Sequence, residues 1–327
     1  MRNHKHRAAA ILLLCLLIFA QFSVSAAGLI DTTHACTLTV RYLDGNTPIS
    51  GAPFELYRVA DISAYGELTL TEEFSAYPVR LDDLDSDGWK TLAETLTGYV
   101  LRDQLKPLDS GRTGTDGTLT FPNRQKALLP GLYLVYGKPF STGKYNYTTE
   151  PFLVQLPVTN MASNTWQYDL TVMPKHTRED VPETPSQTVT RKVLKVWDDS
   201  GHASGRPESI TVQLLKNGTI YDTVTLNSAN SWRYTWDKLP KYDTDGSLIE
   251  WRVVETAVGG YTVSVTQDGI TTVITNTNKT NPPAPDKPSQ PNLPQTGVLW
   301  WPAALLTVLG VLLLLAARHT GGRRRHA

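Results

Sequence analysis

The chain has 327 residues with 31 basic and 31 acidic side chains, so its formal net charge is zero. Zero net charge and only 19% charged residues exclude a nucleic-acid-binding protein that works through a basic surface, and 40% hydrophobic residues exclude a disordered chain. The first 26 and last 31 residues are basic and contain no acid. Residues 27–296 alone carry 24 basic and 31 acidic groups, a net charge of −7.

Residues 1–26 have the pattern of a secretory signal peptide: a basic start, an apolar run over 8–20 and a short polar stretch that ends at Ala26. The apolar run is too short to cross a bilayer, so we expect cleavage after Ala26 rather than a membrane helix. Cleavage removes Cys15 and leaves Cys36, so no intramolecular disulfide can form. We interpret Cys36 as a small residue near the start of a strand; a reactive thiol is the alternative.

The C-terminal residues 293–327 combine three parts in a fixed order. A charge-free stretch over 298–317 is long enough for one membrane helix, and a basic tail over 318–327 follows it. The pentapeptide ahead of this stretch is Leu293, Pro294, Gln295, Thr296 and Gly297. Together the parts resemble the sorting signal of Gram-positive surface proteins. The resemblance implies that a sortase cleaves after Thr296 and passes the threonine carbonyl to an amine, which makes the membrane span transient. A permanent single-span anchor is the alternative.

Between the two ends, alternating apolar and polar runs separated by Asp-Gly and Asn-Gly turns indicate strands. Two polar, proline-containing segments interrupt this pattern: a linker over 177–189 and an extended, proline-rich spacer over 280–292. They delimit a first domain over 29–176 and a second over 190–279. The predicted fold class is all-β, with two tandem β-sandwich domains and a C-terminal sorting-signal helix. Roughly seven strand-like runs in the second domain favour a sandwich.

The first domain also contains one predicted helix. From Trp89 onward, apolar residues recur at helical spacing on one face: Leu92, Ala93, Leu96 and Val100. We expect this inserted helix to lie on an edge of the sandwich.

An acidic stretch at the start of this helix matches the calcium-loop pattern of an EF-hand through Asp83, Asp85, Asp87 and Glu94. Lys90 occupies a position that is apolar in such loops, and no helix is predicted before Asp83. We therefore predict no metal here and interpret the stretch as an acidic turn with Asp87 near the helix cap. Calcium binding is the weaker alternative.

Three polar residues of the second domain stand in apolar phase on their strands. Lys195 alternates with Val193, Glu255 with Val253, and Asn276 with Ile274. Buried polar groups need partners, so we expect the three to meet. A neutral amine beside a carboxamide, with a carboxyl group to carry protons, can expel ammonia and leave a Lys–Asn isopeptide bond. Polar residues at strand ends are the alternative.

The surrounding residues resemble the Cna protein B-type domain over nearly all of 191–277. The segments that carry the likeness are Lys195–Asp199, Leu239–Asp243 and Ile274–Thr277. The resemblance implies a reverse immunoglobulin-like sandwich in which Lys195 and Asn276 form the bond and Glu255 is its internal, single-turnover catalyst. Lys192, which is out of phase, ranks second as the bonding lysine.

The first domain ends in a segment that resembles the pilin motif of sortase-built pili. Its residues are Trp166, Leu170, Val172, Met173, Pro174 and Lys175. The resemblance implies that Lys175 is the nucleophile that accepts the threonine carbonyl of the next subunit. Leu170 and Met173 depart from the usual Val and Tyr, and a solvated linker lysine is the alternative. The first strand, 38–42, has no lysine, and Gly137 stands where a catalytic glutamate is expected, so we predict no isopeptide bond in this domain.

Two functions follow from these patterns. The first is a structural subunit of a sortase-assembled surface pilus, joined between Lys175 and Thr296 of neighbouring subunits. The second is a monomeric, wall-anchored adhesin that binds a host or matrix ligand. The implied partners are a sortase, identical subunits, minor pilins and peptidoglycan, with no nucleic acid and no cofactor. The scattered histidines after residue 26 form no catalytic motif, so we predict that the chain is not an enzyme.

Overall fold

The computed structural model describes residues 28–124, 127–160, 162–183, 187–199 and 203–278. These residues belong to one compact unit that ends at Asn278. Most of its regular structure is β-sheet, so the predicted all-β class is confirmed. Within the described ranges, no helix is long and apolar enough to cross a membrane. The predicted signal peptide, spacer and sorting signal lie outside these ranges.

The N-terminal domain carries most of the elements. Its strands are β1 (Thr37–Arg41), β2 (Leu43–Asp44), β3 (Thr47–Pro48), β4 (Pro53–Ile62), β5 (Leu68–Leu70), β6 (Asp109–Arg112), β7 (Thr118–Phe121), β8 (Gly131–Gly137), β9 (Phe140–Ser141), β10 (Tyr145–Thr149), β11 (Phe152–Leu156), β12 (Val158–Asn160), β13 (Thr165–Gln167), β14 (Asp169–Val172) and β15 (His176–Asp180). Its helices are α2 (Glu72–Ser75) and α3 (Ser86–Arg102). The larger sheets run in the orders β14-β1-β7, β11-β8-β4-β5 with β6 on β4, and β15-β10-β9, and β2-β3 and β12-β13 form two small pairs.

The C-terminal domain is a two-sheet sandwich. Its elements are β16 (Thr188–Asp198), the 3-10 turn η1 (Ala203–Gly205), β17 (Ser209–Lys216), β18 (Thr219–Asn227), β19 (Arg233–Pro240), β20 (Trp251–Glu255), β21 (Thr262–Asp268) and β22 (Thr271–Thr277). One sheet has the order β19-β16-β22-β21 and the other β18-β17-β20. The β17–β18 hairpin turns through Asn217 and Gly218, both at positive φ, which suits an Asn-Gly turn. These seven strands lie close to the seven runs that the sequence predicts.

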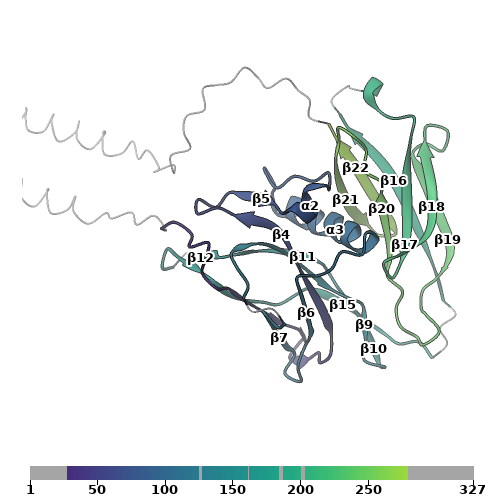
Figure 1. Ribbon diagram of the computed structural model, residues 1–327. Coiled ribbons are helices and arrows are strands. Elements are labelled where there is room, and N and C mark those ends of the chain that lie inside the picture. Colours follow the sequence, from purple (N-terminus) through teal and green to yellow (C-terminus); the bar gives the residue numbers. More distant parts are fainter. Residues whose placement is uncertain (1–27, 125–126, 161, 184–186, 200–202, 279–327) are drawn as a thin grey trace, which may run out of the picture. The chain divides into compact units, whose positions relative to one another are not determined.

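The helix α3 covers the face of a sheet, so the predicted position on a sandwich edge is wrong. Every residue of β8 is buried, because β8 packs one face into the sandwich core and the other against the helices. Leu92, Ala93, Leu96 and Val100 join Leu132 and Leu134 in the second of these clusters. A strand that is apolar in both phases needs cover on both faces, and α3 supplies it. The same helix also contacts β20 and β21 of the C-terminal domain (Figure 1).

The two domains share one strand arrangement. In each, the first strand runs parallel to a strand near the end of the domain: β1 pairs β14, which precedes β15, and β16 pairs β22, the last strand of the C-terminal domain. Parallel pairing places the start of the first strand and the end of its parallel partner at opposite ends of the domain. A chain pulled at those two points therefore loads the pair in shear.

The linker is shorter than predicted. Residues 176–180 form β15, which pairs antiparallel with β10 of the N-terminal domain. β16 begins at Thr188, so that its first residues pair with β19. Residues 181–187 connect the two strands.

Candidate functional site

Lys195 and Asn276 come from adjacent parallel strands of one sheet. In the β16–β22 register, Lys195 lies opposite Ile274, and Asn276 lies two residues further along β22. Side chains two residues apart share a face, so Lys195, Ile274 and Asn276 all point into the sandwich. All three are buried, whereas Lys192 on the same strand is exposed.

Glu255 reaches the pair from the opposite sheet. It is the last residue of β20, and its side chain is fully buried between the sheets. The Asn276 Nδ2 donates to Glu255 Oε1 at 2.9 Å, and the Lys195 Nζ lies 3.7 Å from Glu255 Oε2. One carboxylate oxygen thus faces the amine and the other faces the amide nitrogen. Within the described residues, Glu255 Oε2 and Asn276 Oδ1 have no hydrogen-bond partner.

Burial shifts both ionisable groups of this triad toward their neutral forms. It lowers the pKa of Lys195 to about 8, with the charge of Glu255 opposing the shift and that of Arg206 adding to it. Burial also raises the pKa of Glu255, against the opposing effects of Lys195 and of the Asn276 hydrogen bond. Lys195 and Glu255 can share one proton. Surroundings of low polarity favour the state in which the amine is neutral and the acid is protonated. That state has the nucleophile and the proton donor that amide exchange requires.

An aromatic ring covers the amine, a feature that the sequence analysis missed. The Lys195 Nζ lies 4.4 Å from the centroid of the Trp197 ring, which also packs edge-on against Trp232 and Tyr261. Besides these rings, the amine donates to the carbonyls of Val196 at 3.0 Å and Ile274 at 3.4 Å. The triad is therefore shielded from bulk solvent, because its lysine and glutamate side chains are fully buried.

Lys175 stands apart from this triad, at the C-terminal end of the N-terminal domain. It lies between β14 and β15, with an exposed side chain, and its carbonyl accepts a hydrogen bond from the backbone N–H of Glu150 at 3.1 Å. Leu170 and Val172 of β14 pack against the domain core. Met173 is 64% exposed, and the Trp166 Nε1 donates to the Gly28 carbonyl.

The Lys175 side chain borders a groove of about 320 Å³. Trp89, Phe152 and Met173 give the groove apolar walls. Lys90 and Glu150 pair on it, with Nζ and Oε2 3.4 Å apart. An exposed primary amine beside an open groove can be approached by another protein chain.

The residues of the weaker alternative, a calcium site, have other partners in the structure. Asp85, not Asp87, caps α3 by accepting from the Gly88 N–H at 2.8 Å. Asp83 lies 3.8 Å from Arg80, and Glu94 pairs with Arg252 at 2.7 Å. In the part of the chain that the structure describes, no group of three or more His, Cys, Asp or Glu residues could hold a metal ion.

Cys36 is fully buried next to the core of the N-terminal domain. Burial raises the pKa of its thiol to about 11, so the thiol is not ionised at neutral pH. Its position favours the packing interpretation over a reactive cysteine. The pentapeptide from Leu293 to Gly297 lies outside the described residues.

The described residues thus form two tandem, mostly β domains, the second of which contains the buried Lys–Glu–Asn triad. Residues 30–177 match the family described as Gram-positive pilin subunit D1, N-terminal domain, and residues 191–277 match the Cna protein B-type domain. The chain therefore contains a Gram-positive pilin D1 domain followed by a Cna B-type domain, and these are domains of structural pilins and adhesin-like proteins.

Two curated relatives agree with this assignment. Over 90 residues, or 27% of the chain, it is 40% identical to a collagen adhesin of Staphylococcus aureus, covering 8% of that protein. Over 143 residues, or 43% of the chain, it is 30% identical to the fimbrial subunit type 1 of Actinomyces viscosus, covering 24% of that protein. The chain thus matches less than a quarter of the length of each. The full-length major pilin SpaD from Corynebacterium diphtheriae aligns over 76% of this chain and 99% of its own, at 14% identity and a TM-score of 0.27.

Proposed function

We propose that the chain is a structural subunit of a sortase-assembled pilus, joined from Lys175 of one subunit to Thr296 of the next and stiffened by a Lys195–Asn276 isopeptide bond. The observation that carries the proposal is the exposed Lys175 amine at the end of a domain that matches pilin subunits. The fimbrial relative supports the same role.

The internal bond would form by amide exchange, in which the Lys195 nitrogen replaces the side-chain nitrogen of Asn276. The neutral Lys195 amine attacks the Asn276 side-chain carbonyl carbon, and the protonated Glu255 gives its proton to the amide nitrogen, which leaves as ammonia. Glu255 then takes the proton that the Lys195 nitrogen loses. Each carboxylate oxygen already faces one of the two nitrogens, so no large movement is needed. The products are one new amide bond and one ammonia, with Glu255 unchanged.

The subunit–subunit bond follows the same amide chemistry with a sortase as catalyst. The sortase breaks the Thr296–Gly297 peptide bond and keeps the threonine carbonyl as an acyl group. The Lys175 amine of a neighbouring subunit then takes this acyl group, and the fragment from Gly297 onward leaves with a free amine. The final acceptor at the cell surface is an amine of peptidoglycan, so the polymer is attached to the cell wall.

This linkage defines the path that tension takes through a subunit. Force enters at the Lys175 side chain, follows residues 176–194, crosses the Lys195–Asn276 bond and leaves along the chain to Thr296. Because β16 and β22 are parallel, the same force without the bond would shear them apart. Residues 28–174 and 196–275 lie beside this path and carry little of the tension.

The decisive experiment replaces Lys175 with Arg. Guanidinium keeps the charge but stays protonated, so it cannot act as the nucleophile. Boiled cell-wall extracts of the unmodified strain should show a high-mass ladder, and the Lys175→Arg strain should show single subunits that are still attached to the wall. Lys90→Arg, in the same groove, is the matched control and should leave the ladder intact. A ladder that persists in the Lys175→Arg strain contradicts the proposal.

Wall attachment has a test of its own. Thr296→Ala removes the residue whose carbonyl the sortase transfers, so the chain should stay in the membrane fraction. Recovery of the Thr296→Ala protein in digested cell wall would overturn the sorting-signal hypothesis while leaving the internal bond untouched.

A monomeric adhesin is the second candidate, favoured by the 40% identity to a collagen adhesin. In that case Thr296 is joined directly to peptidoglycan, and Lys175 is an ordinary surface lysine. A single discrete band in wall extracts of the unmodified strain, with its sortases expressed, would select this function.

A further inference from the structure

Glu255 sits on an edge strand of its sheet. β20 pairs only with β17 in the order β18-β17-β20, and β21 is likewise the last strand of β19-β16-β22-β21. Edge strands present unpaired N–H and C=O groups on their open side. The sandwich therefore has an open side, between β20 and β21, next to the catalytic carboxylate.

The helix α3 of the N-terminal domain closes this side. The Arg102 Nη1 donates to the backbone carbonyl of Glu255 at 3.1 Å. The Thr95 Oγ1 accepts from the Val265 N–H at 2.9 Å. In the loop before α3, the Pro78 carbonyl accepts from the Val263 N–H at 2.7 Å. Backbone groups of both edge strands thus find their partners in the other domain.

Close packing accompanies these hydrogen bonds. Tyr99, Leu215 and Val254 form a buried apolar cluster across the two domains. Gly98 approaches so closely that a Cβ there would lie 3.0 Å from Val254 Cγ2. Val254 is the residue next to Glu255 and faces the helix, while the Glu255 side chain points toward Lys195 and Asn276.

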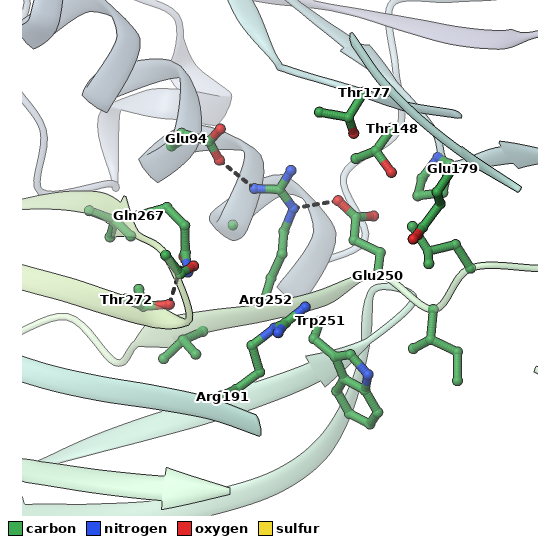
Figure 2. A pocket seen from close by; sticks show the side chains of 17 residues that line it. Glu94, Thr148, Thr177, Glu179, Arg191, Glu250, Trp251, Arg252, Gln267 and Thr272 are labelled. Carbon is green, nitrogen blue, oxygen red and sulfur yellow. Dashed lines mark hydrogen bonds and ion pairs between the residues drawn. The ribbon is translucent and has the colours of Figure 1, made fainter. Parts of the chain in front are cut away.

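An ion-pair network holds the other end of β20. The Arg252 guanidinium donates to Glu94 of α3 at 2.7 Å and to Glu250 at 2.6 Å (Figure 2). Tyr136 of β8 also hydrogen-bonds Glu250. β20 is therefore held to the N-terminal domain at both of its ends.

We propose that α3 is part of the machinery that makes the Lys195–Asn276 bond, with Arg102 as a positioning residue that fixes the end of β20 and so the Glu255 carboxylate. This inference rests on the bond of the proposed function. The N-terminal domain docks first, seals the open side of the sandwich against water, and ammonia is then lost. Once formed, the bond keeps the sandwich in the shape that α3 recognises.

The charged and titratable groups around the triad are those whose interactions would change if water entered this side of the sandwich. From α3 these are Tyr99 and Arg102. Within the C-terminal domain, Lys195 faces Glu255, and the charge of Arg206 acts on Lys195. The Tyr99 hydroxyl has no hydrogen-bond partner within the described residues, and its pKa is raised first by burial and then by the Glu255 charge. Water on this side would favour the charged pair over the neutral pair, which lowers the concentration of the reactive form.

The test follows ammonia loss in residues 27–296, the mature chain of the proposal. Unreacted chain held in urea is refolded by dilution at a series of pH values, quenched, and measured by intact mass. Arg102→Ala should slow the mass loss by about tenfold or more, because misplacement of a catalytic group is costly. Arg102→Lys, which can still donate, should recover part of the rate. Arg178→Ala, a matched arginine on β15 that pairs with Asp44, should match the unmodified chain.

The pH profile separates positioning from simple loss of stability. In Arg102→Ala, water should raise the Lys195 pKa and lower the Glu255 pKa. The acid limb, below which the amine is protonated, then moves to higher pH, and the alkaline limb, above which the acid is ionised, moves to lower pH. Thr95→Val, which removes only the acceptor for Val265, should show the same change to a smaller degree and guards against misfolding of Arg102→Ala. Unchanged rates and limbs in both folded variants, with folding checked by circular dichroism, overturn the role of α3. An unmodified chain that keeps its full mass overturns the bond, and this inference with it.

Discussion

Both domains pair their first strand in parallel with a strand near their C-terminal end, but the side chains on the inner face of this pair differ. In the N-terminal domain, the core positions of this pair are apolar: Leu38 and Val40 on β1, opposite Leu170 and Val172 on β14. In the C-terminal domain, Lys195 and Asn276 take core positions on β16 and β22. The structure thus contains one sandwich held by packing and one equipped for a covalent cross-link.

The proposed linkage explains this difference. Lys175 follows β14, so tension that enters there bypasses the β1–β14 pair. The β16–β22 pair lies between Lys175 and Thr296 and would carry all of it. A buried Lys–Glu–Asn triad is costly to maintain in a core, and it is placed where the strands would otherwise shear. The proposed cross-link thus lies on the proposed path of tension, whereas the strand pair outside that path is held by packing.

Loss of the cross-link should have the largest effect. The bond would close a loop of 82 residues from Lys195 to Asn276, and by analogy with a disulfide it stabilises by about 4–5 kcal/mol. Asn276→Ala leaves the Lys195–Glu255 pair but removes the acceptor of the bond. Its free energy of unfolding, from urea denaturation followed by a C-terminal-domain tryptophan signal, should fall by about this amount. Equal stability of the two proteins would mean that no cross-link exists.

A matched pair of core truncations should separate the domains. Val40 on β1 and Val193 on β16 are both buried, and removing two methyl groups from either costs about 2–3 kcal/mol. In limited proteolysis, Val40→Ala should expose the N-terminal domain to cleavage, while Val193→Ala should leave the cross-linked domain resistant. Adding Asn276→Ala to Val193→Ala should abolish that resistance. Equal sensitivity of the two single variants would remove the contrast between the domains.

The smallest effect is expected at Lys192. This residue lies three positions before Lys195 on β16, but its side chain is exposed. Lys192→Ala should change stability by less than about 0.5 kcal/mol and should leave ammonia loss intact. If the Lys192→Ala chain kept its full mass, Lys192 rather than Lys195 would be the lysine that forms the bond.

Much of the site could be predicted from local pattern, because strand periodicity is a local property. The phases of Lys195, Glu255 and Asn276 place each side chain on the inner face, and the structure brings the three together. The chain positions of the seven C-terminal strands follow from alternation and turn residues in the same way.

The contacts between domains could not be predicted in this manner. Helical spacing shows that α3 has an apolar face, but not that Arg102 and Thr95 serve edge strands more than 150 residues away. Glu94 fits the spacing of a calcium loop, but its partner in the structure is Arg252, which is distant in sequence. Local spacing cannot reveal such a partner. The role of residues 176–180 as a strand was hidden by their polar composition, since both faces of β15 are largely exposed.

The most direct test of the central claim is the intact mass of residues 27–296, combined with fragmentation of the linked peptides. The unmodified protein should weigh one ammonia less than its sequence requires, with the cross-link mapped to Lys195 and Asn276. Glu255→Ala should restore the full mass, because the proton carrier is lost. A folded, unmodified protein of full mass, or a cross-link mapped within residues 28–174, would contradict the account.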